Sequence, residues 1–316
     1  MADPRHRLIL LAALAVLVCA LFLGVNLTGK LSYILSYRAQ VIATMILVGT
    51  ATGVSTVLFQ TITGNRILTP SVMGAEALFV LIQTSIIFFI GSARWDSVPV
   101  VGRFAIETSA MVVFALTLYR WLLVGKSEDL YRLLLAGLVF GILFRSAAEL
   151  LQRMMAPNEF NILQGRLFAQ LTLPESRLLG IAGGLVALCV ALLWRYRRDF
   201  DVIALGRDVA IGLGVDYPRI VTRALVLITV LISTSTALIG PLTFLGFMTA
   251  TLAYQLAGSQ RHALLLPFSA LLGVIFLAGG QLVLEHLFAM TGTLSVVIEF
   301  TGGALFLLML LRKGRL

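Results

Sequence analysis

The sequence carries little charge and a large share of apolar side chains. Aspartate, glutamate, lysine and arginine together make up 12% of the 316 residues, whereas 59% of the residues are hydrophobic. Soluble domains carry about 25% charged residues, so this shortage excludes an ordinary water-soluble fold. A membrane-spanning helix needs roughly 20 mostly apolar residues, so a chain of this length has room for about ten of them. We therefore predict an all-α polytopic membrane protein in which residues 1–316 form a single transmembrane domain.

Cysteine and catalytic motifs are also scarce. The two cysteines, Cys19 and Cys189, each lie in an apolar stretch, where a thiol behaves as a small hydrophobic group. This excludes a disulfide framework or a cysteine metal cluster. The sequence contains no G-x-x-x-x-G-K-[ST] loop for ATP, no zinc-binding H-E-x-x-H motif and no G-x-S-x-G nucleophile elbow. We therefore expect a protein that is not an enzyme and that uses no cofactor and no metal.

Ten apolar runs set the expected topology. They cover roughly residues 8–25, 40–62, 71–92, 104–124, 133–155, 177–194, 222–239, 241–257, 263–286 and 295–311. An even number of spans leaves both termini on one side of the membrane, and most basic residues between the spans fall on that side. Because basic loops favour the cytoplasm, we expect both termini to be cytoplasmic. The formal net charge of +9 is then a topology signal, not a sign of nucleic-acid binding.

Two connections are longer than a simple turn. The first covers residues 195–221, begins with four largely basic residues and continues into a short amphipathic stretch with glycines. It predicts two short helices at the cytoplasmic face, although a loop that only fixes topology has the same composition. The second, on the outer side at about 156–176, predicts a short helix at the membrane surface. Its role as a lid, a docking surface or a plain connector stays open.

Two turns break helices. Residues 64–71 place Asn65 and Pro70 between the second and third spans, and Gly240-Pro241 separates the seventh and eighth spans at what we expect to be the opposite face. Proline suits a helix start because its missing N–H has no partner there. Broken helices in a membrane are tolerated where protein or a water-filled path satisfies their backbone groups. They therefore indicate a translocation path.

A few ionisable residues lie within the spans, where each needs a partner, a cavity or an interface. Arg145 and Glu149 are four apart on one helical face, so they can form an ion pair, or they can line a path in which Arg145 meets an anionic cargo. Glu299, beside Thr301, is a second candidate, for which path lining and buried hydrogen bonding are both open. We interpret Glu76 as an interfacial side chain near a span end.

Several motifs occur in a fixed order along nearly the whole chain. They are Arg38 before the second span, Gly49 followed by Gln60, the turn from Asn65 through Pro70 to Gly74, the segments Ala204-Leu205-Gly206 and Leu213-Gly214-Val215, and the turn from Gly240 to Gly246 that reads G-P-L-T-F-L-G. Together they resemble the permease family of iron-siderophore, haem and cobalamin ABC importers. Val41 replaces the second arginine of the family's R-x-P-R motif, and Ala250-Thr251 replaces its Pro-His pair.

The turn N-R-I-L-T-P, together with residues 158–163, resembles one branch of this family. That branch imports ferric catecholate and mixed-ligand siderophores such as petrobactin, vibriobactin and anguibactin, and its permeases commonly pair with a second, different permease. The resemblance implies a type II ABC importer permease fold in the cytoplasmic membrane of a bacterium. It also implies as partners two ATPase subunits, a second permease in a heterodimer or a homodimer, a periplasmic or lipoprotein siderophore-binding protein, and the ferric siderophore itself.

The resemblance assigns roles to individual residues. It implies that the ATPase contact is made by Ala204, Leu205, Gly206, Arg207, Asp208, Leu213, Gly214 and Val215. It implies that the translocation path is lined by Arg145, Glu149, Glu299 and Thr301, and that Arg38 docks the binding protein. The helix breaks are formed by Asn65, Pro70, Gly74, Gly240 and Pro241. The alternatives are a permease for haem or cobalamin, a proton-coupled secondary transporter that uses Glu149 or Glu299 in a proton relay, and a membrane subunit of a larger complex.

Overall fold

The computed structural model describes residues 3–25, 30–123, 130–168, 176–288 and 292–312, and the regular structure in these ranges is entirely helical. The helices are α1 (Pro4–Gly24), α2 (Leu31–Thr63), the 3-10 helix η1 (Pro70–Met73), α3 (Ala75–Ile90), α4 (Ser92–Asp96), α5 (Val100–Leu123), α6 (Leu130–Met154), α7 (Pro157–Leu167), α8 (Ser176–Arg195), α9 (Arg197–Ile203), α10 (Arg207–Gly212), α11 (Tyr217–Ile239), α12 (Thr243–Ala257), α13 (His262–His286) and α14 (Leu294–Arg312). The predicted all-α fold is confirmed.

Each of the ten predicted apolar runs coincides with a helix. Seven of these helices, α1, α2, α5, α6, α8, α11 and α13, are long and apolar enough to cross a membrane, by length and composition. The other three are α3, α12 and α14. With 16 and 15 residues, α3 and α12 are shorter than the predicted runs because each begins directly after one of the helix breaks. The protein is therefore a multi-pass membrane protein.

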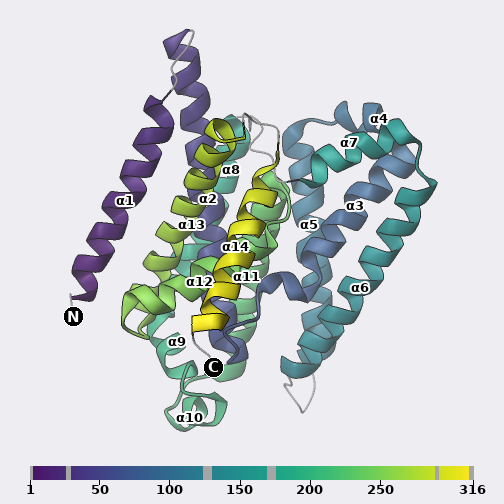
Figure 1. Ribbon diagram of the computed structural model, residues 1–316. Coiled ribbons are helices and arrows are strands. Elements are labelled where there is room, and N and C mark those ends of the chain that lie inside the picture. Colours follow the sequence, from purple (N-terminus) through teal and green to yellow (C-terminus); the bar gives the residue numbers. More distant parts are fainter. Residues whose placement is uncertain (1–2, 26–29, 124–129, 169–175, 289–291, 313–316) are drawn as a thin grey trace.

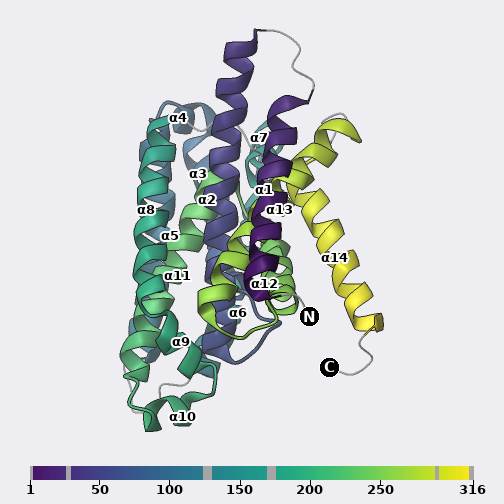
Figure 2. The ribbon, with the colours of Figure 1, turned by 90° about the vertical axis from the view of Figure 1, so that its left-hand side faces the viewer.

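The two ends of the bundle carry different short helices. At one end lie α9, α10, the start of α1 and the end of α14, and at the other end lie α4 and α7 (Figures 1 and 2). Below, these are called the α10 end and the α4 end. The predicted helix in residues 156–176 is α7, and the two predicted short helices in residues 195–221 are α9 and α10. Sequence composition therefore located both functional connections correctly.

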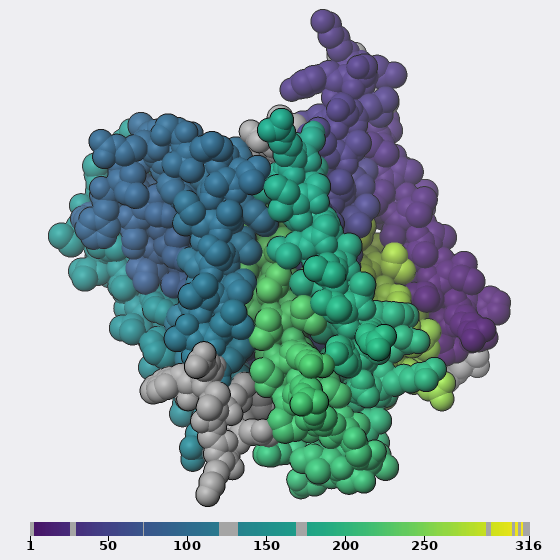
Figure 3. All heavy atoms as spheres, turned by 180° about the vertical axis from the view of Figure 1, so that it is seen from behind, coloured from purple at the N-terminus to yellow at the C-terminus, as the bar shows by residue number. Residues whose placement is uncertain are grey.

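Around the long central helix α2 the helices form two groups. One contains α1, α11, α12, α13 and α14, and the other contains α3, α5, α6 and α7 (Figure 1). From behind, α8 and α11 lie side by side next to α5 (Figure 3). In the most apolar stretch of each helix, the share of residues buried inside the protein is 72% for α2 and 67% for α11, but only 17% for α6. Helix α6 therefore presents most of its surface to the outside of this subunit.

Glycine lets α2 and α13 touch backbone to backbone. A Cβ atom added at Gly49 would lie 2.6 Å from the carbonyl carbon of Gly273, and one added at Gly53 would lie 2.5 Å from the carbonyl oxygen of Ser269. Gly137 of α6 packs in the same way against the backbone of Met73, where an added Cβ would lie 2.9 Å away. Small residues are the usual means of close helix approach in membranes. Glycine thus fixes both the α2–α13 contact and the contact between α6 and η1.

The substitution Gly49→Val tests the α2–α13 contact. The added side chain has no space against the α13 backbone, so the helices must separate, and we expect a loss of roughly 1–3 kcal/mol or more. The measurement is the melting temperature of the purified protein in detergent. Gly180→Ala on α8 is the control, because no atom lies within 4 Å of its added Cβ, and it should leave the melting temperature unchanged or slightly raised. Equal melting temperatures for Gly49→Val and the wild type would contradict the contact.

Candidate functional site

The segments that follow the two helix breaks lie next to each other inside the bundle. After α2, the chain turns at Gly64, which has φ 63°, and then re-enters the bundle through η1; Gly74, with φ 80°, begins α3. The second break follows α11, where Gly240 has φ 89° and Pro241 leads into α12. Only glycine adopts these left-handed angles without strain. The sequence placed these turns at opposite faces of the membrane. Gly64 follows the end of α2 that packs against α9, whereas Gly240 lines a cavity beside α4, so the turns do lie toward opposite ends of the bundle. The segments that follow the two turns nevertheless meet, because one carboxylate contacts both of them.

Glu76, in the first turn of α3, is that carboxylate. Its Oε1 accepts a hydrogen bond of 2.8 Å from the Ser71 hydroxyl in η1, and its Oε2 accepts one of 2.9 Å from the Thr243 hydroxyl at the start of α12. The sequence interpretation of Glu76 as an interfacial side chain therefore missed its main role. Ser71 and Thr243 were missed as well, although each follows a proline of a break motif by one or two positions. That spacing was the available signal.

Glu76 lies at the base of a cavity of about 360 Å³ between α3 and α6, which we call the groove. It is lined by Ser71, Gly74, Glu76, Ala77, Leu138, Gly141, Ile142, Arg145, Ser146, Glu149 and Thr243. The structure therefore brings the predicted residues Arg145, Glu149 and Gly74 together. Glu299 of α14, like Arg145, is near enough to interact electrostatically with Glu76. Two of the predicted path residues, Arg145 and Glu149, thus line the same cavity as Glu76, which was not predicted as a path residue.

Arg145 and Glu149 do not form the ion pair that their spacing suggested. Both side chains are exposed, and the ion pairs found among the described residues do not join them. Their charges therefore face the groove instead of neutralising each other. Thr301, also exposed, donates its hydroxyl to the carbonyls of Val297 and Ile298 in its own helix, at 2.8 and 3.1 Å. Its place in a path stays a prediction.

Arg38 is held tightly at the α4 end of α1. Its guanidinium donates to the carbonyl oxygens of Phe22 and, at 2.6 Å, Val25, which end α1, and it lies 3.7 Å from the carboxylate of Glu285 in α13. Only 11% of its side chain is exposed. These contacts make Arg38 a clamp between α1, α2 and α13. Its predicted role in docking a binding protein stays a prediction.

The α10 end presents an apolar tip. Leu205, Val209, Ile211 and Leu213 are 48–63% exposed around α10, whereas Ala210 is buried. Gly206, with φ 106°, and Gly214, with φ 85°, allow the chain to turn sharply before and after the helix. Exposed apolar side chains grouped in this way mark a surface that contacts another protein or a membrane. All eight residues predicted for ATPase coupling lie in or beside this tip.

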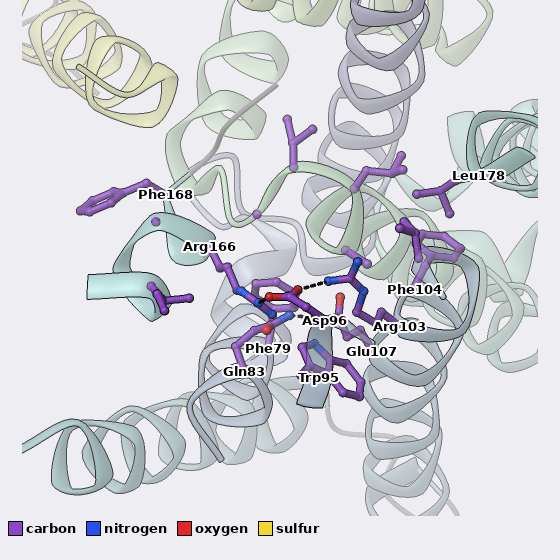
Figure 4. Close-up of a pocket in the computed structure, with 17 residues that line it drawn as sticks. Phe79, Gln83, Trp95, Asp96, Arg103, Phe104, Glu107, Arg166, Phe168 and Leu178 are labelled. Atoms are coloured by element: carbon purple, nitrogen blue, oxygen red, sulfur yellow. Dashed lines mark hydrogen bonds and ion pairs between the residues drawn. The ribbon is translucent and has the colours of Figure 1, made fainter. Parts of the chain in front are cut away.

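At the α4 end, a second cavity of about 460 Å³ lies between α3, α4, α5 and α7 (Figure 4). Asp96 of α4 accepts hydrogen bonds from Arg103 of α5 at 2.7 Å and from Arg166 of α7 at 2.8 Å. At the other end of α7, Glu159 accepts two hydrogen bonds of 3.1 Å from the backbone N–H and the hydroxyl of Ser92. Helix α7 is therefore pinned at both ends over this cavity, which favours a positioned surface over a loose connector.

Comparison with known proteins agrees with this architecture. Residues 8–312 match the model of the FecCD transport family. The chain is 40% identical over 311 residues to the petrobactin import system permease protein YclO of Bacillus subtilis, covering 98% of both chains. It is 38% identical over 279 residues to the petrobactin import system permease protein FatC of Bacillus anthracis, covering 88% of this chain and 79% of that one.

The fold also matches a solved structure. A chain of an ABC transporter described as metal-chelate type, in an inward-facing conformation, superposes with a TM-score of 0.85 at 20% sequence identity, covering 98% of this chain and 99% of that one. At this identity the match concerns the fold. The sequence matches extend over the same residues as the helices described above, including both helix breaks and α10. The chain therefore belongs to the FecCD transport family.

Proposed function

We propose that this chain is the permease subunit of an ATP-binding-cassette importer that carries a ferric siderophore of the catecholate type across the cytoplasmic membrane. The observation that carries the proposal is the groove, where two helix breaks meet at Glu76 beside Arg145 and Glu149. Charged side chains in a membrane mark a polar path or a protein interface, because exposure to lipid is costly. The petrobactin import permeases among the relatives support a siderophore as the cargo.

The open side of the groove requires a second permease. Helix α6 is mostly exposed in the isolated subunit, and its Arg145 and Glu149 would otherwise face lipid. Arg145, Glu76 and Glu149 line the groove, and Glu299 is near enough to Glu76 to interact with it electrostatically. In a homodimer this acidic excess would face its own copy across the path. A heterodimer with a different, more basic permease avoids that repulsion, so we propose the heterodimer as the working assembly.

The two ends of the bundle then have different partners. We propose that the α10 end, where α1 begins and α14 ends, is cytoplasmic and that its apolar tip contacts the ATPase subunit. The basic residues around α9 support this orientation. The siderophore-binding protein would dock at the α4 end. The permease itself is not an enzyme in this scheme, because its ATPase partner hydrolyses the ATP.

Reconstitution tests the proposal. The permease is placed in proteoliposomes with its partner permease, the ATPase and the binding protein, and uptake of ferric petrobactin, haem and cobalamin is compared. We expect ferric siderophore uptake that requires ATP and persists when the proton gradient is dissipated. Uptake that collapses with the gradient while ATP is present would instead indicate a secondary transporter. Preference for haem or cobalamin would contradict the assigned cargo.

Arg207→Glu and Gly206→Val test the ATPase contact. Either change alters the tip at the start of α10, by reversing a charge or by forcing a side chain onto a left-handed backbone angle. In the reconstituted complex we expect ATP hydrolysis to continue while uptake falls about tenfold or more, with the permease still in the membrane. Arg219→Glu, a charge reversal at the start of α11, is the control. If uptake is unaffected by both changes, the coupling assignment is wrong.

Glu76→Ala tests the groove. The hydroxyls of Ser71 and Thr243 lose their common acceptor, and each such hydrogen bond contributes roughly 0.5–1.5 kcal/mol, so both breaks should loosen. We expect siderophore uptake per permease molecule to fall about tenfold or more. Glu76→Gln keeps one acceptor oxygen and should lose less. Wild-type uptake by Glu76→Ala would exclude a role for this carboxylate.

A further inference from the structure

Helix α9 is tied to two spans by a chain of three polar side chains. The carboxylate oxygen Oδ1 of Asp201 in α9 accepts a hydrogen bond of 2.7 Å from the backbone N–H of His262, and it also lies 2.7 Å from Nδ1 of that ring. The other ring nitrogen, Nε2, lies 2.8 Å from the hydroxyl of Thr61. His262 begins α13 and Thr61 lies in the last turn of α2. We call this the Asp201–His262–Thr61 chain.

The centre of the Asp201–His262–Thr61 chain is shielded from water, whereas the side chain of Asp201 is 31% exposed. His262 is only 1% exposed and packs beside the ring of Phe200, whose centroid is 5.8 Å away. Partial burial alone would raise the pKa of Asp201, but the hydrogen bonds from His262 outweigh this effect and hold that pKa below its ordinary value. Asp201 is therefore a carboxylate at neutral pH, which only accepts hydrogen bonds. Charge-assisted hydrogen bonds of this kind are among the stronger ones in proteins.

The chain remains complete whether or not the ring carries an extra proton. Because Asp201 only accepts, Nδ1 of His262 must carry a hydrogen in both forms. With Nε2 unprotonated, the Thr61 hydroxyl donates to it. With Nε2 protonated, that oxygen accepts and gives its own hydrogen to the carbonyl of Val57, 2.9 Å away. The link is therefore permanent at physiological pH and suits a mechanical role.

Both ends of the chain lead to functional elements. On one side, three residues separate α9 from α10, and their turn is closed by hydrogen bonds of 3.0 Å from the Leu205 and Gly206 amides to the carbonyls of Val202 and Ile203. On the other side, Thr61 lies three positions before Gly64, where the first helix break begins and leads to the groove. Figure 2 shows α9 between α10 and the bundle. The chain thus joins the apolar tip to the helices that carry the break.

We propose that the Asp201–His262–Thr61 chain is the positioning link through which movement of α10 is passed to α2 and α13, and so to the groove. The inference rests on the proposed function, in which α10 contacts the ATPase. Helices α2 and α13 touch backbone to backbone. A displacement of α9 that is passed through Thr61 to α2 and through His262 to α13 therefore moves these two helices as one body. Without the Asp201–His262–Thr61 chain, α9 is held to the bundle by apolar packing of Phe200 and Ile203, and movement of α10 is passed to the spans less completely.

The test uses the full reconstituted complex and measures ATP molecules hydrolysed per siderophore imported. Asp201→Ala and Thr61→Val each remove one member of the chain from a different helix, and we expect this ratio to rise about tenfold or more while ATP hydrolysis continues. Asp201→Asn keeps an acceptor oxygen and Thr61→Ser keeps the hydroxyl, so both should stay near the wild-type ratio. Asp199→Ala removes the same charge from α9 outside the chain and is the matched control.

Three outcomes overturn the proposal. The first is an unchanged ratio in both Asp201→Ala and Thr61→Val. The second is loss of ATP hydrolysis in an assembled complex, because the chain would then serve to activate the ATPase. The third is an equal rise in Asp199→Ala. If Asp201→Ala does not assemble, Thr61→Val decides, since it leaves α9 and α10 unaltered.

A second readout separates this inference from the proposed function. Hydrogen exchange is measured on the purified permease alone, where no ATPase or siderophore is needed. In Asp201→Ala the amides of α9 and α10 should exchange about tenfold faster, while those of the middle of α11 stay unchanged. Unchanged exchange in α9 overturns the link itself. Faster exchange in a protein whose complex transports no siderophore would leave the link in place and reject the transport assignment.

Discussion

Where a helix stops inside a membrane, its polar backbone and the residues that follow need partners from the protein itself, because lipid supplies none. In this permease the segments after two such stops lie side by side, and Glu76 is bound by a hydroxyl from each of them. A charged group in this position is costly unless it is hydrogen-bonded and lies on a polar path. The breaks, the carboxylate and the groove therefore belong together: the breaks supply the hydroxyls, and the carboxylate that binds them lines the groove.

The frame behind the groove has the opposite character. Helices α2 and α13 meet through glycine backbones, a contact that leaves no room for independent sliding. The same two helices hold the Asp201–His262–Thr61 chain at one end and the clamp around Arg38 at the other. A stiff body with polar ties at both ends suits alternating access, in which rigid groups of helices move against one another around a fixed path.

The sequence predicted features that depend on local pattern. Apolar runs located the ten helices, the prolines and glycines located both breaks, and composition located α7, α9 and α10. It failed where the result depends on contacts between distant parts of the chain. Thr243 lies 167 positions from Glu76, and Asp201 lies 61 positions from His262, so no periodicity relates them. The prediction of an Arg145–Glu149 ion pair failed for another reason. Their spacing on one helix permits an ion pair, but in the structure both side chains line the groove without pairing.

The groove is lined by both basic and acidic side chains, and this combination affects how strongly a charged cargo would bind there. A ferric catecholate is an anion, and a wall of arginines at low dielectric would bind it too strongly for release. In the proposed transporter, Arg145 shares the groove with the carboxylates of Glu76 and Glu149, so we expect this wall to guide an anionic cargo without holding it. The attraction that brings an anion into the path must then come largely from the facing subunit. In the proposed heterodimer, the two different permeases divide these tasks between them, one wall for entry and one for release.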